Sequence, residues 1–424
     1  MATAPPAMKA ESAGAGLRAI LIATAVAGII GYAIQLLAPS LLPGGSAYVT
    51  FSMYWSTLYL CVAALSGLQQ EITRASHPAA ESPPDARVRD FALIVIGVVV
   101  AAVALVALTA GGAVLPGPTA ALAIALGIGL CGYVLVAVLG GVLYGLRLWN
   151  AVAWLTIIDA VIRGILVVAG LLAGWSAQWI AFAISVPFGL AFLAVWARMR
   201  SRVVGAFRVD VTLRRLLINA AGTVTAAAAM GVMMNGMPLL LGLTAGDTDR
   251  TLLAGLILTI TVTRAPLVVP LLALQSYLIS IFRSAGRAVM RRILPILAAV
   301  ASGVALVAVA AWFIGPWAIS FISRGQYVVT PLMMATITVG AGLVGMMCIT
   351  GPALVATSRH VPYTAGWVSA ALLTIAVLAL PVPLPFEARL GLALIVPPAV
   401  GLAVHVVAVW RHPAVDPAVE TSAA

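Results

Sequence analysis

The chain has 424 residues, of which 63% are hydrophobic and 8% are charged, and its mean hydropathy is +1.14. No water-soluble globular domain of this length has such a composition, which indicates that lipid is the solvent. In hydrocarbon every backbone N–H and C=O needs an internal partner, so the long apolar runs are expected to be helices. The net charge of +11 comes almost entirely from arginine, because Lys9 is the one lysine, and we take this bias as no sign of nucleic-acid binding.

Apolar windows between charged residues and Pro or Gly breaks, taken in chain order, predict twelve transmembrane helices. The windows are 17–38, 48–68, 91–113, 119–143, 151–173, 177–197, 216–243, 252–278, 293–314, 330–351, 363–383 and 390–410. The first window exceeds the length of a signal-peptide core, so we expect it to remain in the membrane. A β-barrel would show short alternating segments instead, and the prediction is therefore an all-α polytopic membrane protein.

Basic residues in the connections predict which side of the membrane each connection faces. With the N-terminus inside, eighteen basic residues fall on cytoplasmic segments, whereas the outer segments hold only Arg250, Arg324 and Arg389. Positively charged connections resist translocation, so this asymmetry predicts a cell inner-membrane protein with both termini in the cytoplasm. An odd number of spans would break the alternation, which supports twelve spans independently of hydropathy.

The basic connection that follows the sixth window divides the chain into six spans and six. We expect a cytoplasmic tail, a six-helix bundle, the basic connection, a second six-helix bundle and a cytoplasmic tail, over 1–16, 17–197, 198–215, 216–410 and 411–424. Transporters commonly duplicate a six-helix unit in this way, with the substrate path between the halves. The short loops leave no room for a soluble domain, and no GxxxxGK[ST] phosphate-binding loop is present in the sequence.

Three ionisable residues lie deep within the predicted spans, namely Asp159 and Arg163 in the fifth and Arg264 in the eighth. A charge at the bilayer centre costs at least about 2.5–3.5 kcal/mol, so each should face protein or water and have a partner. Asp159 and Arg163 are four residues apart on one helix face, where they either neutralise each other or place a guanidinium on a lumen wall. Arg264 has no acid in its own helix. It either pairs with Asp159, bonds carbonyls freed by Pro266 and Pro270, or binds substrate.

The two buried arginines come from different halves and from similar depths, about 18–20 Å by helical rise. We expect Arg163 and Arg264 to form a cationic cavity, with Asp159 tuning the guanidinium or accepting a proton. A guanidinium presents a planar fork of donors that suits pyrophosphate or carboxylate better than a neutral sugar. Gln35 and Asn235 could line the same path, although single amides in spans usually bond a neighbouring helix. These five residues are the predicted substrate-binding set.

No sequence pattern indicates a metal, a cofactor or a catalytic site. Cys61, Cys131 and Cys348 lie singly in apolar runs and are expected to be small buried side chains. The four histidines have no metal-ligand spacing. No Ser/His/Asp set or acidic pair with loop access is visible, so we do not expect an enzyme.

Two segments carry a resemblance to a known family. The inner end of the second span reads ALSGLQQEITRAS (Ala64–Ser76), and the eighth-span stretch reads VTRAPLVVPLLALQSYLISIFRSAGR (Val262–Arg287). Together with twelve spans and short loops, they make the chain resemble the multidrug/oligosaccharidyl-lipid/polysaccharide (MOP) exporter superfamily, in particular its Wzx-like polysaccharide flippases and its peptidoglycan-precursor flippases. The resemblance implies a MATE-like fold whose two bundles rock around a cationic cavity, and it places Arg264 at the family's basic position in the eighth span.

The resemblance further implies the activity. We expect a flippase that moves a polyprenyl-(pyro)phosphate-linked oligosaccharide by alternating access, for cell-surface polysaccharide biosynthesis. A lipid-linked peptidoglycan precursor is the less expected cargo, because such members carry basic residues inside the first span, whereas Arg18 lies at its edge here. The expected partners are the lipid-linked glycan, membrane lipids, a polysaccharide polymerase and glycosyltransferases, and no nucleic acid or cofactor.

Three alternatives stay open. A major-facilitator carrier would show a Gly-x-x-x-Asp-Arg-x-Gly-type signature after the second span, where this chain has Gly67 followed by Glu71. A multidrug-extruding relative of the same superfamily would need acidic cation sites in the lumen, for which Asp159 is the candidate. The third alternative is a membrane-embedded glycosyltransferase or a non-transporting assembly scaffold. The glycosyltransferase would need catalytic carboxylates, for which Asp247 and Asp249 on the outer face are the candidates, in a GDTDR tract that also suits an ordinary helix cap.

Overall fold

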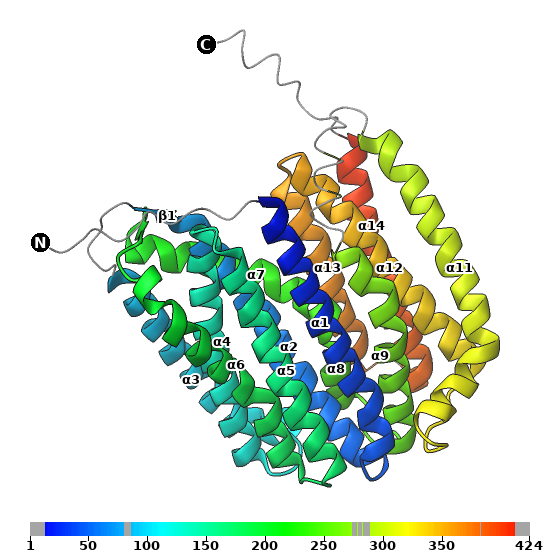
Figure 1. Cartoon of the computed structure of the whole chain (residues 1–424). Helices are drawn as coiled ribbons and strands as arrows, with labels where there is room; N and C mark the ends of the chain where they lie inside the picture. Colours follow the sequence, from blue (N-terminus) through cyan, green and yellow to red (C-terminus); the bar gives the residue numbers. More distant parts are fainter. Residues whose placement is uncertain are drawn as a thin grey trace, which may run out of the picture. The chain divides into compact units, whose positions relative to one another are not determined.

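A computed structural model of the chain describes residues 13–79, 86–273, 278, 282, 289–381 and 383–411 (Figure 1). The outer parts of both predicted tails, up to 12 and from 412, lie outside the described residues. So does most of the basic inner end of the eighth predicted span, between 274 and 288.

The chain divides into two compact units. Unit 1 holds the described residues up to Leu42 together with Thr50–Gly231, and unit 2 holds Pro43–Val49 and the described residues from Val232 onward. The chain therefore passes from one unit to the other inside α2 (Gly44–Ala75) and inside α7 (Leu213–Asn235). The sequence prediction had begun the second bundle at 216, but most of α7 belongs with unit 1.

The helices of unit 1 are long and follow one another through short connections. They are α1 (Ala13–Leu41), most of α2, α3 (Ala86–Val114), α4 (Thr119–Gly145), α5 (Trp149–Leu172), α6 (Ala177–Val203) and α7 to Gly231. Helix α4 packs against α3 and α6, and α5 packs against α1 and α6. Glycine permits the close approach of α4 to α6, because a Cβ at Gly132 would lie 2.8 Å from the Gly189 nitrogen.

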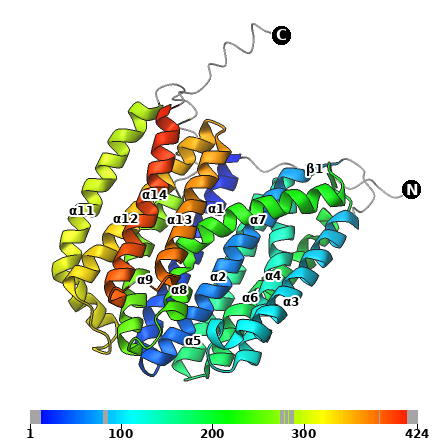
Figure 2. The same ribbon diagram turned by 180° about the vertical axis from the view of Figure 1, so that it is seen from behind.

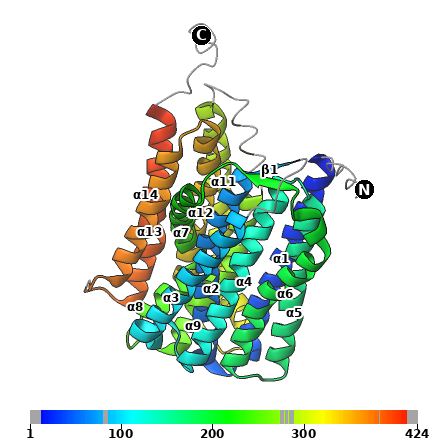
Figure 3. The ribbon, with the colours of Figure 1, turned by 90° about the vertical axis from the view of Figure 1, so that its left-hand side faces the viewer.

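A short two-stranded sheet joins the two connections that flank α2 and α7 at one end of unit 1. Strand β1 (Ser76–Pro78) follows α2 directly, and β2 (Phe207–Val209) precedes α7. The strands pair antiparallel, with Ser76 opposite Val209. Figure 3 shows this ribbon lying across the helix ends. The sequence prediction contained no strand, because a three-residue ladder between distant loops leaves no periodic signal.

Unit 2 is built around α12. Its helices are α8 (Met237–Thr244), α9 (Arg250–Ala273), α11 (Val289–Ile322), α12 (Pro331–Ala356), α13 (His360–Ala379) and α14 (Phe386–Arg411). Helix α12 packs against α9, α11 and α14, and α13 packs against α14 (Figure 2). The large apolar side chains of α11, such as Leu306, Phe313 and Phe321, are exposed, as expected of a helix that faces lipid.

The helices reproduce the predicted spans closely. Within the described residues, eleven helices are long and apolar enough to cross a membrane, and α9 is a further 24-residue helix. The clearest departure is the seventh predicted span, 216–243, which is not continuous: α7 ends at Asn235 and α8 starts at Met237. Gly236 and Pro238 explain the break, because glycine weakens a helix and proline lacks the N–H that the helix interior requires.

Candidate functional site

Arg163 of α5 lies inside unit 1 and is bonded through every nitrogen of its guanidinium. Its Nη2 donates to the Asp159 carboxylate at 2.5 Å, its Nη1 to the Tyr59 hydroxyl at 2.5 Å, and its Nε to the Ile184 carbonyl at 2.9 Å. The guanidinium carbon also lies 4.2 Å from the centre of the Phe188 ring. The residue is only 5% exposed. Asp159 and Arg163 therefore pair along one turn of α5. Their spacing of four residues had allowed either this pairing or a guanidinium on a lumen wall, and the structure shows the pairing.

The pairing argues against the alternative interpretation, in which Arg163 lines a lumen wall. A guanidinium that binds a substrate anion needs donors to spare, whereas the Arg163 nitrogens already bond three protein acceptors. The surrounding aromatic side chains reinforce the burial, because Tyr59 stacks on Trp55 with ring centres 4.8 Å apart. Arg163 and Asp159 therefore act first as an internal clamp that joins α2, α5 and α6.

Arg264 of α9 is the contrasting case in unit 2. It is half-buried, and its Nη1 donates to the main-chain carbonyl of Met234 at 3.4 Å. In the described part of the chain, no carboxylate forms an ion pair with this guanidinium. Asp159, one of the alternative partners that the sequence left open for Arg264, is bonded to Arg163 at 2.5 Å. Arg264 consequently keeps donors that no described acidic residue occupies.

The sequence explains why the Met234 carbonyl, which Arg264 bonds, has no helical N–H partner. In an α-helix the carbonyl of residue 234 accepts from the N–H of residue 238, and residue 238 is proline. The break between α7 and α8 therefore exposes the Met234 oxygen, and Arg264 reaches it from α9. We had expected Pro266 and Pro270 of the same helix to free such carbonyls, but the observed acceptor comes from the Pro238 break in the neighbouring segment.

Gln35 and Asn235, the two remaining predicted site residues, lie in different units. Gln35 is half-buried in α1 of unit 1. Asn235 is half-buried and is the last residue of α7, next to the Met234 carbonyl that Arg264 bonds. Asn235 therefore belongs to the same local feature as Arg264, and Gln35 does not.

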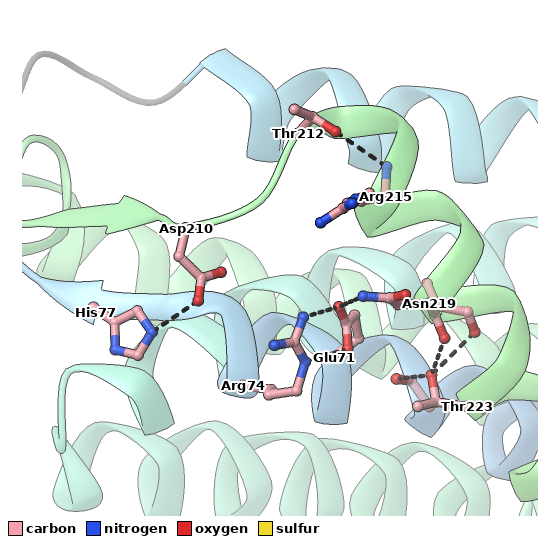
Figure 4. A network of polar contacts seen from close by, with 10 residues as sticks. Glu71, Arg74, His77, Asp210, Thr212, Arg215, Asn219 and Thr223 are labelled. Carbon is pink, nitrogen blue, oxygen red and sulfur yellow. Dashed lines mark hydrogen bonds and ion pairs between the residues drawn. The ribbon is translucent and has the colours of Figure 1, made fainter.

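A polar network that the sequence did not predict ties α2 to α7 within unit 1 (Figure 4). Glu71 is 2% exposed and accepts from Arg74 at 2.7 and 2.9 Å and from the Asn219 side-chain amide at 2.9 Å. One turn further along α7, the Thr223 hydroxyl donates to the Gly67 carbonyl at 2.8 Å. The Glu71–Arg74 spacing was visible in the sequence, but nothing local identified Asn219 as the third member. The bond of Asn219 to Glu71 gives this amide a structural role.

His405 of α14 is fully buried in unit 2 and bonds through both ring nitrogens. Its Nδ1 lies 2.9 Å from the Thr350 hydroxyl and its Nε2 lies 3.0 Å from the Tyr363 carbonyl. A carbonyl can only accept, so Nε2 carries the proton. The Thr350 hydroxyl also lies within hydrogen-bond distance of the Met346 and Met347 carbonyls, at 3.2 and 3.3 Å. The arrangement is that of a structural histidine. No group of three or more metal-ligating side chains was found among the described residues.

One of the two acids that a glycosyltransferase would need is explained by local structure. Asp249 immediately precedes α9, and its carboxylate accepts from the Leu252 backbone N–H at 3.0 Å. This is the geometry of an N-cap, which satisfies one of the free donors at the start of a helix. The capping reading of the GDTDR tract therefore accounts for Asp249.

Comparisons with solved structures give the class of the protein. The fold matches the lipid II flippase MurJ in its inward closed conformation with a TM-score of 0.65, at 13% identity and over 92% of this chain and 86% of that one. It matches an inward-facing multidrug resistance MATE transporter of the MOP superfamily with a TM-score of 0.64, at 14% identity and over 94% and 96%. The chain is thus an all-α multi-pass membrane protein whose fold is like those of MurJ and the MATE transporter.

Sequence comparison identifies relatives with higher identity to the chain. The chain is 32% identical over 399 residues to the uncharacterized proteins Mb3654 of Mycobacterium bovis and Rv3630 and Rv1510 of Mycobacterium tuberculosis, covering 92% of this chain and 90% of each relative. It belongs to the family of these mycobacterial membrane proteins. No family model matches the sequence.

Proposed function

We propose that the protein is a flippase that moves a polyprenyl-(pyro)phosphate-linked oligosaccharide across the inner membrane by alternating access, and that it supplies cell-surface polysaccharide biosynthesis. One observation carries the proposal. Arg264 is a half-buried guanidinium in the middle of a membrane helix, anchored by one nitrogen to the Met234 carbonyl and without an acidic partner among the described residues. Such a group needs an anion, and a pyrophosphate fits its planar donor fork.

Arg264 carries this role better than Arg163. The Arg163 guanidinium donates three of its five N–H groups to Asp159, Tyr59 and Ile184, and the Asp159 carboxylate already balances its charge. Asn235, which adjoins the Met234 carbonyl, is the second residue that we assign to the anion site. The polyprenyl chain would stay in the bilayer while the charged headgroup crosses.

A multidrug-extruding function is the main rival, because the fold likeness to MATE transporters is as strong as that to the flippase. Binding of an organic cation requires an unpaired carboxylate. Asp159, the candidate acid within the predicted spans, has an arginine partner at 2.5 Å. Unit 1 has a carboxylate that is already paired, and unit 2 has a guanidinium without an acidic partner among its described residues. This combination favours an anionic cargo over an organic cation.

The proposal includes orientation and partners. Both termini are assigned to the cytoplasm on the basic residues of the connections. A polymerase and glycosyltransferases are the partners that a lipid-linked glycan requires before and after translocation.

The test is flipping by purified protein in proteoliposomes that contain a polyprenyl-pyrophosphate-linked oligosaccharide, followed by the accessibility of the sugar to a membrane-impermeant enzyme. Arg264→Ala should reduce flipping at least about tenfold, the loss expected when one charge-assisted bond of roughly 1.5–3 kcal/mol is removed. Arg264→Lys should retain part of the rate. The matched control is Arg324→Ala, which removes an exposed arginine of unit 2.

Normal flipping by the Arg264→Ala protein would remove the residue from the mechanism. Flipping of an organic cation that exceeds that of the lipid-linked glycan, with loss of the activity in an Asp159 variant, would favour the multidrug rival.

A further inference from the structure

The strongest charged surface outside the proposed transport site lies at one end of unit 1. It is formed by the segment 198–215, which holds the end of α6, strand β2 and the start of α7. The segment carries six arginines, at 198, 200, 202, 208, 214 and 215, and all six are exposed. We call these six residues the arginine face.

Among the described residues, no acidic side chain pairs with the arginine face. Asp210 is the only acid in the segment, and its carboxylate is bonded to His77 of β1 at 3.2 Å (Figure 4). In the described part of the chain, none of the six guanidinium groups has an ion-pair or hydrogen-bond partner. A concentration of unpaired cations of this kind attracts an anionic partner.

Exposed apolar side chains adjoin these cations on the same helix faces. Ile218 is 56% exposed and lies four residues after Arg214 on α7. On α6, the exposed Leu193 lies seven residues, or two turns, before Arg200. A ligand that covers both features must have an anionic head and an apolar tail.

We propose that the arginine face binds anionic phospholipids of the surrounding leaflet, with the lipid phosphate against Arg200 and Arg214 and the acyl chains along Leu193 and Ile218. An acidic soluble protein would satisfy the guanidinium groups but would make no contact with the apolar side chains beside them, which lie within predicted membrane spans. Basic residues beside a membrane span each contribute to the attraction of anionic lipid. The assignment is independent of the transported cargo and of the transport activity.

Native mass spectrometry of the full-length protein in detergent tests the assignment, with phosphatidylglycerol or phosphatidylcholine added at equal concentration. The wild-type protein should bind phosphatidylglycerol more tightly than phosphatidylcholine. Arg200→Gln/Arg214→Gln should weaken phosphatidylglycerol binding about tenfold or more and leave phosphatidylcholine binding unchanged. The control Arg250→Gln/Arg324→Gln removes the same charge from exposed positions of unit 2 and should bind both lipids as the wild type does.

Several results would overturn the assignment. They are equal binding of the two lipids by the wild-type protein, equal phosphatidylglycerol binding by the variant and the wild type, and an equal loss in the control. If water-soluble glycerol phosphate displaces phosphatidylglycerol as effectively as added lipid does, the surface binds the anionic headgroup and has no site for the acyl chains. Release of a copurifying acidic protein, with lipid binding intact, would make the surface a protein-docking face.

A second variant keeps the test decisive if the glutamine variant aggregates. Arg200→Lys/Arg214→Lys retains both charges and should keep the preference for phosphatidylglycerol within about threefold, because the attraction depends on charge more than on the guanidinium fork. Loss of the preference in this variant, with normal thermal stability, would contradict the electrostatic basis of the proposal.

Discussion

At the scale of single residues, the two buried arginines of the membrane interior differ in what surrounds them. Arg163 has a carboxylate, a hydroxyl, a carbonyl and an aromatic face around it, whereas Arg264 has a single carbonyl bond recorded at 3.4 Å. A buried charge that is fully partnered stabilises a fold only as long as its partners remain. The same residue type therefore supports different predictions at the two positions.

Removal of one member of the Asp159–Arg163 pair should be strongly destabilising. Asp159→Asn leaves a buried guanidinium without its counter-charge, and breaking a buried pair costs about 3–5 kcal/mol. The apparent Tm of the purified protein in detergent should fall well below that of the wild type. In Asp159→Asn/Arg163→Met no charge is left unpaired, so the double variant should recover part of the loss. A double variant less stable than Asp159→Asn would show that the pair is not the source of the effect.

His405 should be replaceable only at a cost in stability. His405→Phe keeps an aromatic ring beside Tyr363 but removes the ring-nitrogen bonds to the Tyr363 carbonyl and the Thr350 hydroxyl, and each lost bond costs about 0.5–1.5 kcal/mol. The matched control is His360→Phe, at an exposed position at the start of α13, where the apparent Tm should be unchanged. Equal Tm values for the two variants would mean that the buried bonds contribute nothing net.

At the scale of elements, the break between α7 and α8 positions a side chain of a different helix. Pro238→Ala restores an N–H four residues after Met234, so the Met234 carbonyl can accept within its own helix and Arg264 loses its anchor. Alanine is also the better helix former, so the apparent Tm should be equal or higher. In the flipping assay, the substrate concentration at half-maximal rate should rise, because the guanidinium is no longer held in place.

Pro187→Ala is the control for that prediction. Pro187 also lies inside a membrane helix, α6 of unit 1, so its replacement changes helix propensity in the same direction without touching the Arg264 anchor. Unchanged half-saturation in both variants would show that the Met234 carbonyl does not position Arg264.

The elements were largely predictable and the polar contacts between them were not. Helix lengths follow from apolar windows that must span a bilayer, so each predicted span has its helix, and Gly236 with Pro238 could have marked the break in the seventh. The Asp159–Arg163 pair followed from helical periodicity. The Glu71–Asn219 bond and the Arg264–Met234 bond join residues distant in sequence, and no periodicity within one helix encodes which neighbour a side chain meets.

At the scale of the whole molecule, the covalent path between the two units limits where the backbone can bend when one unit moves. The chain crosses between the units inside α2 and inside α7, as well as in the connection before α2. Any change of one unit relative to the other must therefore be absorbed at all three crossings, near residues 42–43, near residues 49–50 of α2 and near residues 231–232 of α7. Hinges are a few positions that take up such a change in backbone angles, often at small residues. Gly231 is the residue of α7 at this boundary.

Gly231 is tightly packed as well as placed at the boundary. A Cβ at Gly231 would lie 2.9 Å from the Ala63 Cβ of α2, closer than side chains tolerate without a shift. Gly231→Ala should therefore both crowd the α2–α7 contact and stiffen α7, since alanine restricts the backbone that glycine leaves free. The prediction is a reduced maximal rate of flipping, with little change in the substrate concentration at half-maximal rate, because the anion site around Arg264 is untouched.

The same helix provides the control that separates a hinge from a general helix effect. Gly222 lies nine residues earlier in α7, is exposed, and a Cβ there would meet nothing within 4 Å. Gly222→Ala should raise helix propensity by up to about 1 kcal/mol and leave the flipping rate unchanged. If both alanine variants flip at the wild-type rate, α7 bends elsewhere. If both are equally slow, helix stiffness alone limits transport and the boundary at Gly231 has no special role.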